Sequence, residues 1–184
     1  MTPQEAVDKL KQGNERFVSS TSSCILDNVE VRKELKEVQE PFAIVLGCSD
    51  SRAPPEILFD TGLGKLFVIR IAGNVADPLQ VDSVNFAAKV LGSPLLVVLG
   101  HQNCGAVRAV LDGQDKAIPA VAALIRSSLP NTDVSLEKAT KDNVRATCNY
   151  FREKPELKAL IDQGTFRVVG GYYSFQTGKV EFFE

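Results

Sequence analysis

Short apolar runs and periodic apolar positions alternate along this chain of 184 residues. Three uninterrupted runs are rich in Val, Ile, Leu and Phe, and they cover residues 42–47, 66–72 and 95–100. Runs of this length are typical of strands that are buried on both faces of a parallel sheet. A fourth run, at 166–170, precedes a Thr-Gly-Lys turn at 177–179 and a short run at 180–183. This last pair predicts a hairpin at one edge of the sheet.

The segments between the runs carry helical patterns. In residues 79–91 the apolar side chains recur at spacings of three and four, which predicts an amphipathic helix. Thr2 and Pro3 suit the start of another helix, which is expected over 3–13. Further helices are expected at 104–111, 117–127 and 133–152, and a polar loop at 18–30.

Alternating strands and helices predict the α/β class, with a mostly parallel central sheet flanked by helices. We expect a single domain over 1–184, in which an N-terminal helical arm of about residues 1–38 precedes an α/β core of about 39–184. A nucleotide-binding α/β module is disfavoured, because the chain lacks both a G-x-G-x-x-G turn and a P-loop lysine motif.

Composition narrows the function classes. Lys and Arg number 21 and Asp and Glu 23, so no strong field favours binding to nucleic acid or to an anionic membrane. No apolar run is long enough to span a bilayer, and the first residues include an acidic side chain but no apolar signal segment. These features predict a cytoplasmic protein. In such a protein the four cysteines are expected to be metal ligands or buried thiols rather than disulfides.

Two of the buried strands end on residues with chemistry. Cys48 follows the first strand, and His101 and Cys104 follow the third, three residues apart. Carboxyl ends of parallel strands meet at one edge of a sheet, so these side chains can face one point. Two thiolates and an imidazole suit tetrahedral zinc and leave a fourth position for catalysis. The spacing alone also fits a buried apolar thiol and a hydrogen-bonded histidine.

Four further residues bear on this site. Asp50 and Arg52 follow Cys48 closely, and an arginine can hold a carboxylate ionised in bidentate geometry. The same pair can equally be an ion pair that only stabilises the loop. Cys24 lies in the polar loop and Cys148 in a helical pattern, so neither is expected to be a ligand.

Several segments, in this order, resemble the motifs of the β-carbonic anhydrases. The first motif is Cys-Ser-Asp-Ser-Arg at 48–52, followed by Pro55 and Glu56. The others are Leu-Phe-Val-Ile-Arg-Ile-Ala-Gly-Asn at 66–74 and Gly-His-Gln-Asn-Cys-Gly-Ala at 100–106. Similar segments also lie at 10–17, 170–173 and 177–180, so the resemblance spans almost the whole chain.

The resemblance implies a zinc enzyme that hydrates carbon dioxide reversibly to bicarbonate and a proton through zinc-bound hydroxide. It implies one zinc per chain on Cys48, His101 and Cys104, and a catalytic pair of Asp50 and Arg52. It also implies a homodimer, often paired into a tetramer, with each active site near the subunit interface. Gln39, nine residues before Cys48, matches a glutamine that contacts the substrate across that interface.

Some features of the chain depart from the family or leave alternatives open. Lys65 stands where the family often has Asp, with little effect expected, and the absence of Trp excludes the usual form of a second, inhibitory bicarbonate site. A closed form with Asp50 on zinc is expected at low pH. Because the single histidine is a ligand, turnover should depend on external buffer. The alternatives are a carbonyl sulfide or carbon disulfide hydrolase and a non-catalytic zinc protein with a closed site.

Overall fold

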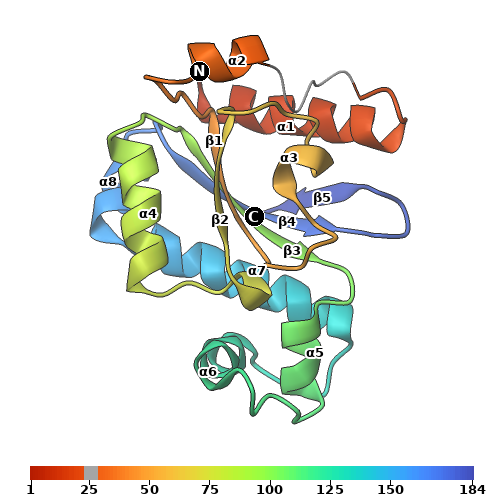
Figure 1. Ribbon diagram of the computed structural model, residues 1–184. Helices are drawn as coiled ribbons and strands as arrows, with labels where there is room; N and C mark the ends of the chain where they lie inside the picture. The colour runs from red at the N-terminus through yellow and green to blue at the C-terminus, as the bar shows by residue number, and fades with distance from the viewer. Residues whose placement is uncertain (23–28) are drawn as a thin grey trace.

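The computed structural model describes residues 1–22 and 29–184. Its centre is a five-stranded sheet in the order β2-β1-β3-β4-β5 (Figure 1). The strands are β1 (Ala43–Gly47), β2 (Leu66–Arg70), β3 (Leu95–His101), β4 (Arg167–Tyr173) and β5 (Val180–Phe183). The first four are parallel, and β5 returns antiparallel to β4. The predicted α/β class and the hairpin at one edge are therefore confirmed.

Helices cover both faces of the sheet. On one face lie α1 (Pro3–Val18) and α3 (Pro55–Leu58), with α1 against β3. On the other, α4 (Pro78–Lys89) packs on β1 and β2, and α7 (Leu136–Arg152) packs on β3 and β4, with α8 (Pro155–Asp162) beside it. Every residue of β1 and β3 is buried, which explains why their sequences are continuously apolar.

Side chains along β1 alternate between two separate cores. Ile44 and Leu46 point into the core under α4 and α7, whereas Ala43 and Val45 point into the core under α1 and α3. This alternation is the two-residue period of a strand. The residues that follow β1 lie at the carboxyl edge of the sheet.

A third apolar cluster lies at that edge, under α5 (Gly105–Leu111) and α6 (Pro119–Ser128). These helices project from the body of the molecule, at the bottom of Figure 1. The short η1 (Ala72–Asn74) follows β2 and contacts both of them. Cys48 and Cys104 belong to this cluster, so the edge that carries the chemistry has an apolar support of its own.

Four helices differ from the sequence prediction. Helix α1 continues to Val18, beyond the expected 3–13. At Gly13 it touches the backbone of Phe59, where a Cβ would lie 1.8 Å from the carbonyl oxygen. A short helix, α2 (Val29–Glu34), begins at the end of the loop predicted over 18–30 and buries no side chain, so its sequence has no apolar stripe. Helices α3 and α8 were not predicted. Cys24 lies outside the described residues.

Lys65 is exposed and comes just before β2, where its carbonyl accepts the backbone N–H of Phe42 at 2.9 Å. This is the amino end of the strand, as expected, away from the edge with the chemistry. Among the described helices, none is both long and apolar enough to cross a bilayer.

Candidate active site

Three sequence-predicted residues meet at the carboxyl edge of the sheet. Cys48 follows β1, His101 ends the neighbouring β3, and Cys104 caps α5. Their ligand atoms all lie within 4.8 Å of one another, and all three residues are buried. Parallel strands that pair side by side bring residues 53 positions apart in the sequence to one point. We call these residues the Cys–His–Cys cluster.

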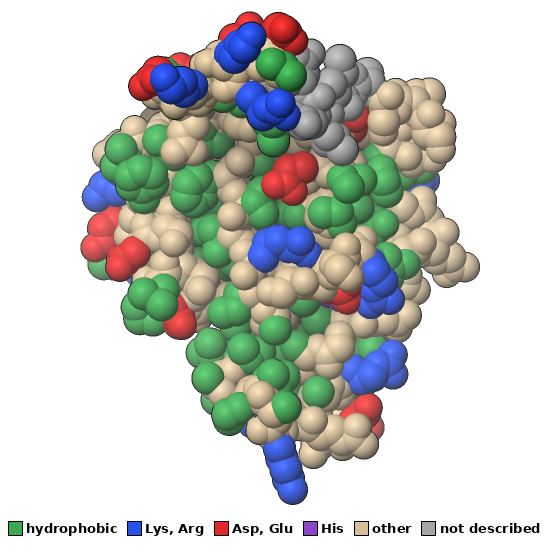
Figure 2. Space-filling model, viewed as in Figure 1, with side chains coloured by type: hydrophobic (Ala, Val, Ile, Leu, Met, Phe, Trp, Pro, Cys, Tyr) green, Lys and Arg blue, Asp and Glu red, His purple; other side chains and the backbone are tan. Residues whose placement is uncertain are grey.

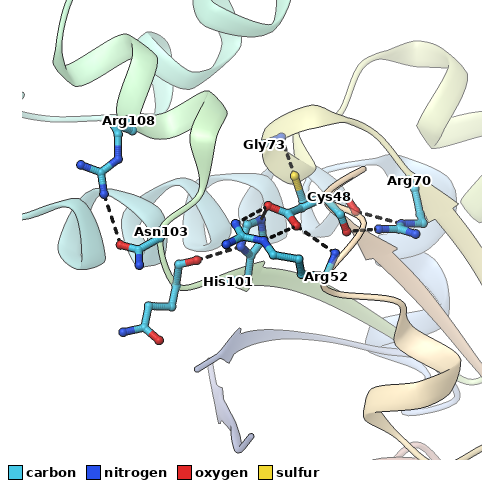
Figure 3. Close-up of polar contacts among 9 residues, drawn as sticks. Cys48, Arg52, Arg70, Gly73, His101, Asn103 and Arg108 are labelled. Atoms are coloured by element: carbon cyan, nitrogen blue, oxygen red, sulfur yellow. Dashed lines mark hydrogen bonds and ion pairs between the residues drawn. The ribbon is translucent and has the colours of Figure 1, made fainter. Parts of the chain in front are cut away.

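The turn between the last two members is tight. Asn103 adopts a left-handed conformation with φ of 55°, and its side-chain oxygen accepts a hydrogen bond from Arg108 at 3.2 Å (Figure 3). Asparagine tolerates this conformation better than most residues. The turn therefore lets His101 and Cys104 face the same point from a strand end and a helix start.

Hydrogen bonds orient the cluster. The ring nitrogen Nδ1 of His101 lies 2.9 Å from the Gln102 carbonyl, so Nδ1 carries the hydrogen and Nε2 keeps its lone pair. Nε2 is buried and has no hydrogen-bond partner. The backbone N–H of Gly73 donates to the Cys48 sulfur at 3.3 Å (Figure 3). A buried lone pair without a partner, beside two sulfurs, fits a metal ion that prefers nitrogen and sulfur ligands.

The charges of the cluster also favour a cation. A hydrogen bond from the Cys104 thiol lowers the pKa of Cys48, and the same bond raises the pKa of Cys104. Burial opposes protonation of His101, but the adjacent Cys48 sulfur and its thiolate charge outweigh burial and raise the pKa of His101. These directions favour a thiolate at Cys48, the form of cysteine that binds a metal ion.

Asp50 and Arg52 form the predicted pair beside the cluster. The Asp50 carboxylate accepts Arg52 Nε at 3.0 Å and a terminal guanidinium nitrogen at 2.8 Å, and it also accepts the Arg52 backbone N–H at 3.0 Å. The side-chain bond from Arg52 is the largest cause of the lowered pKa of Asp50. One carboxylate oxygen lies 3.8 Å from His101 Nε2, so the charge faces the cluster. Asp50 is therefore paired with Arg52, the arrangement expected for an open site; the closed form at low pH stays a prediction.

Two further groups support this loop, and the sequence analysis gave neither a role. Arg70, the last residue of β2, donates to the Cys48 carbonyl at 2.9 Å and to the Asp50 carbonyl (Figure 3). Phe175, just after β4, places its ring 4.3 Å from the Arg52 guanidinium carbon and 5.5 Å from the His101 ring. A cation at the end of an apolar run was a visible signal for Arg70, although the strand itself, β2, is only half-buried. No local pattern pointed to Phe175.

Two other predicted positions lie away from the cluster. Cys148 is buried on α7 in the apolar core, where burial raises the pKa of its thiol to about 12. Gln39 is exposed in the segment before β1, at the opposite end of that strand from Cys48. A five-residue strand spans roughly 16 Å. The structure therefore does not bring Gln39 to the cluster of its own chain.

Comparisons with known proteins agree on one family. A family model described as carbonic anhydrase matches residues 43–180. The carbonic anhydrase of Mycolicibacterium smegmatis is 36% identical over 190 residues, covering 97% of this chain and 92% of that protein. Carbonic anhydrase 2 of Mycobacterium tuberculosis is 34% identical, covering 96% and 91%.

Solved structures support the same fold. The β-carbonic anhydrase CafA of Aspergillus fumigatus superimposes with a TM-score of 0.74 at 24% identity, covering 98% of this chain and 90% of that one. The β-carbonic anhydrase CcaA gives a TM-score of 0.73, also at 24% identity, covering 98% and 87%. With the family match and the curated relatives, the fold leads to one conclusion: the chain belongs to the β-carbonic anhydrase family of carbonate dehydratases.

Proposed function

We propose that the chain binds one zinc ion through Cys48, His101 and Cys104 and uses it to hydrate carbon dioxide reversibly to bicarbonate and a proton. The observation that carries the proposal is the buried Cys–His–Cys cluster with the ionised Asp50 directed at it. The donor set supports zinc, because two sulfurs and a histidine nitrogen are ligands of catalytic zinc sites that keep a fourth position open.

Zinc, when bound, acts as a Lewis acid and brings the pKa of water close to about 7. The residues of the chain supply orientation. Asp50 accepts a hydrogen bond from the attacking oxygen and so directs its lone pair towards the carbon of the substrate. Arg52 keeps Asp50 ionised through its two side-chain bonds. Arg70 holds the backbone from which Cys48 and Asp50 project.

Asp50 also bears on the alternative of a closed, non-catalytic zinc site. Such a site needs a fourth protein ligand, and Asp50 is the carboxylate next to the cluster. Its two oxygens are bound by Arg52 at 3.0 and 2.8 Å, which supports an open site.

We propose further that the active unit is a homodimer, or a tetramer of such dimers, in which Gln39 contacts the substrate of the neighbouring subunit. Exposed apolar side chains support this. Val38, next to Gln39, is 55% exposed, and Phe86 on α4 is 46% exposed. The Phe86 ring centroid lies 6.3 Å from that of Phe67 on the edge strand β2. Figure 2 shows hydrophobic side chains on the surface over α4, the helix that carries Phe86. One structural relative, from Sordaria macrospora, is described as tetrameric.

The proposal is tested by stopped-flow hydration of carbon dioxide with a pH indicator, on protein whose zinc content has been measured. Fast hydration at about one zinc per chain, lost on chelation and restored by zinc, is the expected result. Full zinc content without hydration would contradict it. Carbonyl sulfide and carbon disulfide in the same assay identify the hydrolase alternative, which predicts faster turnover of those substrates.

A further inference from the structure

The Arg52 side chain is anchored at few points for a residue that has to hold a catalytic carboxylate. Its side chain is 57% exposed, so solvent surrounds much of the guanidinium. An exposed ion pair of this kind contributes little by itself, because ordering a long arginine side chain costs about as much free energy as the pair gains. A second contact is therefore needed to keep Arg52 in one geometry.

The ring of Phe175 supplies that contact. The guanidinium carbon lies 4.3 Å from the ring centroid, within the range of a cation–π interaction, while the guanidinium edge donates to Asp50. Stacking on one face and bonding along one edge are compatible, because the guanidinium is planar. Phe175 thus restricts Arg52 without competing for its N–H groups.

Phe175 is itself held against the His101 loop. The Gln102 backbone N–H donates to the Tyr173 carbonyl at 2.8 Å, and the Gln176 backbone N–H donates to the Gln102 side-chain oxygen at 3.2 Å. These two bonds flank Phe175 in sequence. Its ring also meets the Tyr173 and His101 rings edge-on, at 5.1 and 5.5 Å between centroids. The ring is therefore fixed to the strand end that carries His101.

We infer that Phe175 is a positioning residue for the proposed reaction: its ring holds the Arg52 guanidinium on the Asp50 carboxylate. The inference deepens the proposed function and rests on it. The ring links the turn after β4 to the loop after β1, two segments 123 positions apart in the sequence. Without the ring, Arg52 spends less time bonded to Asp50, and the carboxylate is held less strictly towards the cluster.

The test compares variants that keep or remove the ring face. Phe175→Leu should lower kcat for carbon dioxide hydration roughly two- to fivefold, the range of an exposed cation–π contact, with zinc content unchanged. Phe175→Tyr and Phe175→Trp should retain the rate. Phe183→Leu is the matched control, since Phe183 also stacks on an arginine, Arg145 at 4.7 Å, and lies on β5; its rate should equal the wild type.

A double-mutant cycle separates positioning from general packing. If Phe175 acts through Arg52, Phe175→Leu should cause no further loss in an Arg52→Met background. A second readout is independent of activity: nitrogen-detected NMR of the Arg52 side chain should show faster rotation of the guanidinium in Phe175→Leu than in the wild type or in Phe183→Leu. If Phe175→Leu does not fold, Phe175→Met removes the ring while keeping apolar bulk.

Three results would overturn the inference: equal rates for Phe175→Leu and Phe183→Leu, a loss in Phe175→Trp as large as in Phe175→Leu, or full additivity with Arg52→Met. The inference fails separately from the proposed function. If the zinc-loaded wild type hydrates no carbon dioxide, the proposed function is wrong, and the NMR comparison still decides whether Phe175 holds Arg52.

Discussion

The loop after β1 and the segment before it stand at opposite ends of the same strand and differ in how they are held. After the strand, Cys48 is buried and Asp50 is bonded by Arg52, while Arg70 holds both backbone carbonyls. Before the strand, Val38 and Gln39 are exposed, and the helix preceding them, α2, buries no side chain.

A single chain therefore holds the loop after β1 in place but not the segment before it. The loop after β1 is fixed by contacts within the chain, because four parallel strands bring their carboxyl ends together there. The segment before β1 presents apolar and polar side chains to the outside, which suits contact with a second subunit.

The largest effect is expected from removing a metal ligand. Cys48→Ala should lose zinc and lower hydration about a thousandfold or more, because the Lewis acid is lost. Cys148→Ala makes the same substitution at a buried thiol of the apolar core, away from the cluster. It should keep zinc and activity. Metal analysis and stopped-flow rates on both variants check this, and retention of zinc by Cys48→Ala would contradict the proposed ligand set.

The next effect is expected at Asp50. Asp50→Asn removes the charge that accepts a proton or hydrogen bond, and kcat should fall about a hundredfold or more with zinc retained. Asp142→Asn is the control, since Asp142 pairs with Lys138 on the surface of α7. Its rate should match the wild type. If the two variants had equal rates, Asp50 would have no part in the chemistry.

A smaller effect is expected at Gln39. Gln39→Ala should lower kcat/KM about tenfold, the value of one hydrogen bond to the substrate. Mixing Gln39→Ala chains with Asp50→Asn chains tests whether the contact crosses the interface. A mixed dimer then has one site with both residues intact, so random exchange should restore about a quarter of the wild-type sites. No recovery after verified subunit exchange would place Gln39 outside the neighbouring site.

The smallest effect is expected from the buffer. His101 is the single histidine of the chain and lies in the cluster, so no side chain with an ordinary pKa near neutrality is free to carry the product proton away. The kcat should therefore rise severalfold with buffer concentration at constant pH and ionic strength, whereas kcat/KM should change little. Equal turnover in weak and strong buffer would show that another group exports the proton.

Most of the sheet and of the cluster could be predicted because their signals are local. The apolar runs that became β1 and β3 end directly on Cys48 and His101, so topology alone brings these residues together. The roles of Gln102 and Phe175 depend on contacts between segments more than 70 residues apart, for which the sequence carries no pattern. Helix α2 was missed for a different reason: it buries no side chain, so no apolar stripe marks it.

The proposed function depends first on zinc being bound by Cys48, His101 and Cys104. X-ray absorption at the zinc edge tests it directly on active protein at neutral pH. Two sulfurs at about 2.3 Å and two lighter atoms at about 2.0–2.1 Å are expected, and both sulfurs should remain in Cys148→Ala. A spectrum without sulfur, or one that changes in Cys148→Ala, would contradict it.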